Sequence, residues 1–199
     1  MQRIVPIPGG VNSYLDDPNQ AAKGQALQCC LCTEPHNLCL HAWYKRWAIF
    51  ADGRKPVQVS ILRLLCKATG RTVSLLPDFC IPRRQNGPAV LAVFVFALVF
   101  EKATLCAALL KARGDLSPGA VHHSQAQSLR DGFVKRLPDL RAYLAGFKTR
   151  FEPAPSEVGS GHRDLAVVLQ MMRQGWVCIQ EAFVFHGRSL HARCGTALL

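Results

Sequence analysis

The sequence lacks an N-terminal apolar segment and any apolar run long enough to cross a membrane. Residues 1–19 contain proline, glycine and aspartate where the apolar core of a secretory signal would stand, and no Asn-x-Ser/Thr acceptor site occurs. The longest apolar run, residues 89–100, is shorter than the roughly 18 to 20 residues of a spanning helix. Nine cysteines are an odd number for a disulfide framework. We therefore expect a cytoplasmic protein with reduced thiols and no membrane partner.

The sequence also lacks the residue arrangements that indicate an enzyme. It has no Gly-x-Ser-x-Gly elbow and no phosphate-binding loop, and its acidic residues form no evident two-metal cluster. His162-Arg163-Asp164 matches the start of a kinase catalytic loop, but Leu169 stands where the magnesium-binding asparagine is required. We therefore expect a protein without catalytic activity.

Negative charge is scarce. The chain has 13 Asp and Glu against 24 Lys and Arg, which gives a formal net charge of +11. Residues 41–84 hold nine basic and two acidic residues, and residues 111–150 hold eight basic and three acidic residues. A solvated surface usually carries both signs in comparable numbers. The imbalance indicates a polyanionic partner, with nucleic acid ahead of an acidic membrane surface.

Proline, glycine and asparagine divide the chain into five parts. Residues 1–28 have weak periodicity and are predicted to be a largely irregular arm, followed by a β module over residues 29–82. Residues 83–151 are predicted to be a helical domain. Residues 152–161 resemble a linker, and residues 162–199 contain a C-terminal helix and tail. The expected fold class is α+β, with the helices gathered after the strands.

The β module is predicted to contain a hairpin and a third strand. The segments YKRWAIF and VQVSILRLL have the composition of strands, and Asp52-Gly53 between them supplies the geometry of a tight turn. A third short strand, Thr72–Leu76, follows Gly70.

Three helices are predicted after this module. The first helix is predicted to begin at Pro88 and to reach about Lys102, and the second to be capped by Thr104 and to end at Gly114. The third is predicted to begin at Ser117, and Pro138 either kinks it or restarts it. A further amphipathic helix is indicated by apolar residues at helical spacing: Leu165, Val168, Leu169, Met172, Trp176, Ile179 and Phe183. Core packing and a homodimer surface would use this apolar face equally well.

Cysteines near the two ends of the hairpin resemble the knuckles of a zinc ribbon. Two Cys-x-x-Cys turns normally supply the four thiolates. Cys29 and Cys32 form the first turn, but the second has Cys66 followed by Thr69 where the fourth thiolate belongs. Threonine is not a useful zinc ligand. The residues near enough in sequence to replace it are His36, Cys39, Cys30 and His41.

Two outcomes for this site remain open. Either a neighbour completes a zinc site, or the metal is lost and Cys29, Cys32 and Cys66 are small buried apolar residues. In both cases the hairpin returns the chain to the first knuckle, so we expect these three sulfur atoms to converge. Without a fourth ligand, the protein should hold substoichiometric zinc or none.

Three segments carry a resemblance to known proteins. They are Cys29-x-x-Cys32, His41-Ala-Trp-Tyr44-Lys-Arg46, and the block from Arg63 through Cys66-Lys-Ala-Thr-Gly70-Arg71 to Pro77. In these segments the sequence resembles an uncharacterised bacterial family of transposase-like proteins with a zinc-ribbon N-terminus, over about residues 29–151. The resemblance implies a DNA-binding protein associated with a transposable element, as an accessory, a regulator or a remnant.

The third helix is the candidate for reading DNA, as in a helix-turn-helix. Ala126, Leu129, Phe133 and Leu137 fall on one side of a helical wheel and should face the core. The preceding turn is longer than usual, which favours a loose variant of the motif. The residues expected to contact DNA are Arg83, Arg84, Ser124, Gln127, Ser128, Arg130 and Lys135.

An alternative function places the partner elsewhere. In that interpretation the chain is a protein-interaction scaffold, its basic surface is incidental, and the apolar C-terminal helix docks the partner. Binding that depends steeply on salt would indicate phosphate contacts, whereas apolar docking should depend on salt only weakly.

Overall fold

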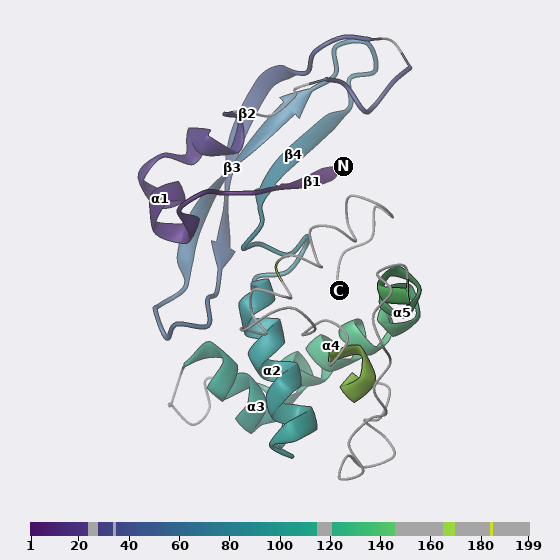
Figure 1. Cartoon of the computed structure of the whole chain (residues 1–199). Coiled ribbons are helices and arrows are strands. Elements are labelled where there is room, and N and C mark those ends of the chain that lie inside the picture. The colour runs from purple at the N-terminus through teal and green to yellow at the C-terminus, as the bar shows by residue number, and fades with distance from the viewer. Residues whose placement is uncertain (24–27, 34, 115–120, 146–164, 170–183, 185–199) are drawn as a thin grey trace. The chain divides into compact units, whose positions relative to one another are not determined.

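The computed structural model describes residues 1–23, 28–33, 35–114, 121–145, 165–169 and 184 (Figure 1). The fold is α+β, as predicted, with a four-stranded sheet. Two short helices lie between its first two strands in the sequence, and the longer helices follow the sheet. The chain divides into two compact units. The first unit comprises residues 1–48 and 56–85, and the second comprises residues 49–55 and 86–199. The chain crosses between the units three times, and the third crossing, at residues 85 and 86, lies near the boundary predicted at residues 82 and 83. The prediction did not separate residues 49–55 from the β module.

The sheet of the first unit has the strand order β1-β4-β3-β2 (Figure 1). β2 (Cys39–Ala48) pairs antiparallel with β3 (Val57–Leu65), and β3 pairs antiparallel with β4 (Thr72–Pro77). The predicted hairpin and third strand are therefore confirmed. The prediction of a tight turn was wrong, because Ala48 pairs with Val57 and the whole segment 49–56 connects the two strands.

The prediction of a largely irregular arm over residues 1–28 was also wrong. β1 (Gln2–Val5) pairs in parallel with β4, and α1 (Gly10–Asp16) and the short 3₁₀ helix η1 (Pro18–Ala21) follow. The Tyr14 side chain is buried, and its hydroxyl donates a hydrogen bond to the Ser60 carbonyl at 2.6 Å. The free edge of β4 supplies the hydrogen bonds that a four-residue strand cannot supply for itself.

The hairpin register sets the position of the candidate metal ligands. Cys39 at the start of β2 pairs with Leu65 at the end of β3, and Cys66 follows directly. β3 is a central strand and its residues Ile61, Leu62 and Leu64 are buried, so the apolar sheet holds this end of the hairpin in place.

The second unit contains α2 (Pro88–Phe100), α3 (Leu105–Arg113), α4 (His123–Val134) and α5 (Leu137–Ala145). The Thr104 hydroxyl accepts a hydrogen bond from the Ala107 amide at 3.3 Å, and Gly114 ends α3 with a φ of 65°. Both predicted caps are confirmed. α4 begins at His123 rather than near Ser117, and Pro138 lies at the start of a separate helix.

The described part of the second unit relates to two further predictions, the lack of a membrane-spanning helix and the C-terminal amphipathic helix. None of its helices has both the length and the apolar character that a membrane crossing requires. Residues 165–169 are helical, and Leu165, Ala166, Val168 and Leu169 are buried. The rest of the predicted C-terminal apolar face, together with the linker over residues 152–161, lies outside the described residues.

Candidate metal centre

The first knuckle is a closed loop. Gln28 and Asn37 form an antiparallel bridge, and the Cys29 amide donates a hydrogen bond to the His36 carbonyl at 2.8 Å. Because these bonds close the loop at its base, they return His36 to the side of Cys29. Cys32 lies within the loop, so the loop carries three of the four clustered ligands.

The second knuckle is the tight turn that joins β3 to β4. The Cys66 amide donates to the Arg71 carbonyl at 2.9 Å, and the Gly70 amide donates to the Cys66 carbonyl at 2.9 Å. Gly70 has a φ of 66°, in the left-handed region that glycine adopts without strain. This geometry explains why a glycine follows Thr69 in the turn.

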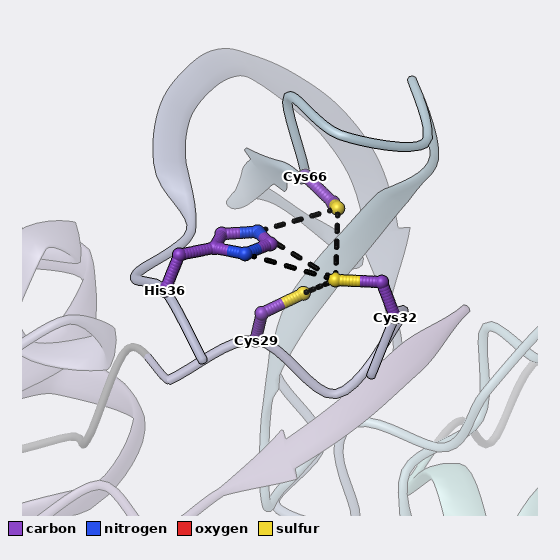
Figure 2. A group of neighbouring side chains, drawn as sticks. All are labelled: Cys29, Cys32, His36 and Cys66. Atoms are coloured by element: carbon purple, nitrogen blue, oxygen red, sulfur yellow. Dashed lines mark hydrogen bonds between the residues drawn. The ribbon is translucent and has the colours of Figure 1, made fainter. Parts of the chain in front are cut away.

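The two knuckles bring three sulfur atoms and one imidazole together (Figure 2). The Cys32 sulfur lies 3.5 Å from that of Cys29 and 3.8 Å from that of Cys66. The His36 Nε2 atom lies 3.4 Å from the Cys66 sulfur. One ligand atom from each of the four residues lies within 4.8 Å of the others. The predicted convergence of Cys29, Cys32 and Cys66 is therefore confirmed, and His36 completes the group.

The dimensions of this cluster fit a tetrahedral zinc ion. Zinc–sulfur bonds of about 2.3 Å in a tetrahedron place two sulfur atoms roughly 3.8 Å apart. The observed sulfur separations of 3.5 and 3.8 Å are close to that value, and all the cysteines in the described residues are free. Three thiolates and one imidazole are also the soft and borderline donors that zinc prefers. The cluster could therefore bind a metal ion such as zinc.

Two of the ligand sulfur atoms accept hydrogen bonds from nearby groups of the chain. The Leu31 amide donates to the Cys29 sulfur at 3.3 Å. A hydrogen bond from the Thr69 hydroxyl, assisted by the Thr69 amide and opposed by burial, lowers the pKa of Cys66 to about 6. Thr69 thus stands at the fourth cysteine position of the pattern without acting as a ligand, and instead contacts the ligand sulfur. No sequence signal predicts this contact, because a threonine in the pattern by itself indicates only a missing thiolate.

The other candidate ligands lie outside the cluster. Cys30 and His41 are exposed, and Cys39 opens β2 in a half-buried position. Among the residues described, Cys29, Cys32, His36 and Cys66 are the only group of potential metal ligands found. Of the four substitutes that sequence proximity suggested, the structure selects His36.

Basic residues surround the second knuckle and continue along the sheet. Lys67 and Arg71 are exposed on either side of Thr69. The sequences of β2, β3 and β4 contain no aspartate or glutamate, although they include Lys45, Arg46 and Arg63. The sheet is therefore positively charged along its strands.

The predicted phosphate contacts Arg83 and Arg84 lie in the turn that ends the first unit. The Arg46 guanidinium donates hydrogen bonds to the carbonyls of Ile81, at 3.1 Å, and Arg84. These bonds hold a turn in which Arg83 has a φ of 60° and is exposed. Arg46 therefore fixes the backbone from which Arg83 projects.

The predicted faces of the third helix are observed in α4. Ala126, Leu129 and Phe133 are buried, as is Leu137 beyond its end, and Ser124, Ser128 and Lys135 are exposed. The predicted inward face is therefore confirmed. The helix-turn-helix remains a prediction, since residues 115–120 between α3 and α4 lie outside the described part.

Asp131 contacts both candidate base-reading residues of α4. Gln127 Nε2 donates to the two Asp131 carboxylate oxygens at 3.0 and 2.9 Å, and the Arg130 guanidinium donates at 2.9 and 3.1 Å. The Gln127 bond, and then the Arg130 bonds, lower the pKa of Asp131. The carboxylate therefore stays ionised and offsets positive charge on the face expected to approach DNA.

Comparison of the chain with protein-family models, with curated proteins and with solved structures gives no match. The resemblance to transposase-like proteins accordingly remains a prediction from the three sequence segments.

Proposed function

We propose that the chain is a non-catalytic, cytoplasmic DNA-binding protein whose β module is held together by a structural zinc ion. The observation that carries this proposal is the convergence of Cys29, Cys32, His36 and Cys66 from two separate turns. An association with a transposable element is part of the proposal and is supported by the sequence resemblance alone. A cytoplasmic location suits the reduced thiols that such a site requires.

The ligand set supports a structural rather than a catalytic metal. Structural zinc sites are closed by four protein ligands, whereas catalytic sites keep one position for water or substrate. Three thiolates and His36 fill all four positions. Zinc there would join the loop that begins at Cys29 to the end of β3, which are otherwise linked through the hairpin. Metal binding would therefore contribute directly to the folding of the module.

The charge distribution supports DNA as the partner. The chain carries a formal charge of +11, and the strands of the sheet contain basic residues without acidic ones. Zinc with three thiolates and a neutral imidazole has a net charge of −1, and Lys67 and Arg71 next to it outweigh that charge. We assign phosphate contacts to Arg83, Arg84 and Lys135, and base contacts to the polar face of α4.

The alternative of a protein-interaction scaffold has less support. The described part of the C-terminal apolar helix is buried, with Leu165, Ala166, Val168 and Leu169 all at most 3% exposed. Those four side chains are already covered within the chain and do not form a free docking surface.

The first test measures zinc content and DNA affinity on the full-length protein. We expect about one zinc per chain and an association constant for duplex DNA that falls with salt, with a log–log slope of about −0.9 per phosphate contact. Binding that is insensitive to salt, or no binding, would contradict the proposal.

The second test separates base contacts from phosphate contacts. Replacing Gln127 or Arg130 by alanine should cost on the order of 1 to 3 kcal/mol on a preferred site and little on random DNA. Replacing Arg83, Arg84 or Lys135 should weaken binding to all sequences and lower the salt slope by about one per lost contact. Equal losses on specific and random DNA for both groups would leave only nonspecific binding.

A further inference from the structure

Two tryptophan side chains are exposed on the outer strand of the sheet. β2 (Figure 1) is an edge strand of the sheet. Its Trp43 and Trp47 side chains are 40% and 47% exposed. Lys45 lies midway between them and is also exposed. Successive strand residues point to opposite faces, so these three side chains project from the same face of β2. We call this group, Trp43, Lys45 and Trp47, the indole stripe.

The register of the hairpin shows that the stripe is regular. Trp43, Lys45 and Trp47 pair with Leu62, Ser60 and Gln58 in turn, and the one register shift of β2 lies before this segment, between Leu40 and Ala42. At about 3.3 Å per residue, the Cα atoms of the two tryptophans are about 13 Å apart, with the Cα atom of Lys45 midway between them.

The aromatic residue on the opposite face of β2, Tyr44, contacts a cationic side chain of the protein. The Arg63 guanidinium lies 4.8 Å from the centre of the Tyr44 ring, so that ring has a cationic partner within the protein. In the part of the chain that the structure describes, the side chains of the indole stripe make no hydrogen bond, ion pair or ring contact. Tryptophan has a large apolar area, and leaving two of them exposed is unfavourable unless a ligand covers them.

The surroundings of the stripe are cationic and polar. β2 and β3 contain no acidic residue, and Gln58 and Ser60 lie across from the stripe with amide and hydroxyl groups. The start of β2 lies beside the knuckle that carries the exposed Lys67 and Arg71. A ligand that follows the stripe toward the metal centre would therefore meet only positive charge on these strands.

We propose that the indole stripe binds single-stranded nucleic acid, with one base stacked on each indole and a phosphate between them contacted by Lys45. Exposed aromatic rings in a basic groove or strip are the means by which proteins bind single strands, because every base has a face on which a ring can stack. Bases within a duplex are stacked on each other and offer no free face. The proposal rests on the proposed function in taking nucleic acid as the partner, and it adds a second, strand-selective surface.

The test measures affinity of the zinc-loaded, full-length protein for three probes of equal length: a thymidine oligonucleotide of about 12 nucleotides, an abasic oligonucleotide and a duplex. The variants are Trp43→Ala, Trp47→Ala and the corresponding Trp→Phe changes, which keep an aromatic face. Each alanine change should weaken thymidine binding about 5- to 150-fold, and each phenylalanine change should restore most of it. Abasic and duplex binding should be unchanged in all four variants.

Each outcome decides between the two proposals. Thymidine binding no tighter than abasic binding, or equal losses on all three probes, would overturn the indole stripe as a stacking surface. Duplex binding that persists in that case would leave the proposed function intact. Conversely, tryptophan-dependent thymidine binding without any duplex binding would support the stripe and overturn duplex recognition. A fall in oligomeric mass in the alanine variants, measured by sedimentation, would show that a second copy of the chain covers the stripe and would overturn the inference.

Discussion

The His36 imidazole lies 3.4 Å from the Cys66 sulfur, although 30 positions separate the two residues in the sequence. The contact joins the loop before β2 to the turn after β3. It gives the cluster a fourth donor that the second knuckle, with Thr69 in place of cysteine, does not supply. The first knuckle loop therefore offers the fourth ligand of the candidate metal site.

Replacing His36 by alanine should remove zinc. We expect about one zinc per chain in the wild type and little after dialysis of His36→Ala against a chelator, because three ligands leave the site open. Metal analysis by mass spectrometry gives the stoichiometry. Cys39→Ser is the matched control and should keep its zinc, since Cys39 lies outside the cluster. The reverse pattern, zinc kept in His36→Ala and lost in Cys39→Ser, would assign the fourth ligand to Cys39.

Replacing Thr69 by alanine should weaken zinc binding without abolishing it. The Thr69 hydroxyl donates a hydrogen bond to the Cys66 sulfur, and this bond lowers the pKa of the thiol. The alanine change removes that hydroxyl. Loss of such a supporting hydrogen bond typically costs about 10- to 100-fold in metal affinity. Competition with a chromogenic chelator measures the affinity. Thr69→Ser keeps the hydroxyl and should bind as the wild type does; equal affinities for the alanine and serine variants would show that the hydroxyl has no role.

Replacing Gly114 by alanine should destabilise the second unit more than the same change at Gly53. A Cβ on Gly114 would lie 2.6 Å from the Gly53 Cα, whereas a Cβ on Gly53 would meet the Gly114 carbonyl oxygen at an ordinary 3.5 Å. Both residues have a positive φ, so each alanine costs about 1 to 2 kcal/mol of backbone strain. Gly114→Ala should add about 1 to 3 kcal/mol from the clash. Chemical denaturation followed by circular dichroism compares them, and equal losses would rule out the clash as a cause.

Replacing Asp131 by asparagine should strengthen DNA binding. The carboxylate holds Gln127 and Arg130, and it places a negative charge on the polar face of α4. Removing one like charge near a phosphate is worth about 1 kcal/mol, or about fivefold in affinity at low salt. Fluorescence anisotropy with duplex DNA measures the change. Asp139→Asn, on α5, is the control and should have a smaller effect; a weaker complex for Asp131→Asn would mean that α4 does not face DNA.

Much of the local structure could be predicted from the sequence because its signals are local. Pro88, Thr104 and Gly114 mark helix ends by backbone rules that act within one turn, and the structure places them there. The inward face of α4 follows from its helical period alone. The N-terminal strand could not be predicted in this way. Its four residues pair in parallel with β4, about 70 positions later, and no pattern within four residues specifies such a partner.

The candidate metal site was predictable only in part, for a related reason. The pattern Cys29-x-x-Cys32 together with Cys66 fixes three ligands, because the hairpin between them has a definite register. Proximity in sequence did not distinguish between the four candidates for the fourth ligand, which were His36, Cys39, Cys30 and His41. The bond from the Cys29 amide to the His36 carbonyl closes the loop and selects His36, and a backbone bond of this kind leaves no sequence signature.

The connection between β2 and β3 limits how this protein can be divided into fragments. The chain leaves the first unit after Ala48 and returns at Pro56, so residues 49–55 belong with the helices. A fragment that begins at residue 86 loses Phe50, which is buried, and also the glycine that Gly114 approaches so closely. A fragment that ends at residue 85 keeps Phe50 without the unit to which it belongs. No single cleavage yields both units complete, and a stable β module on its own requires a short designed turn in place of residues 49–55.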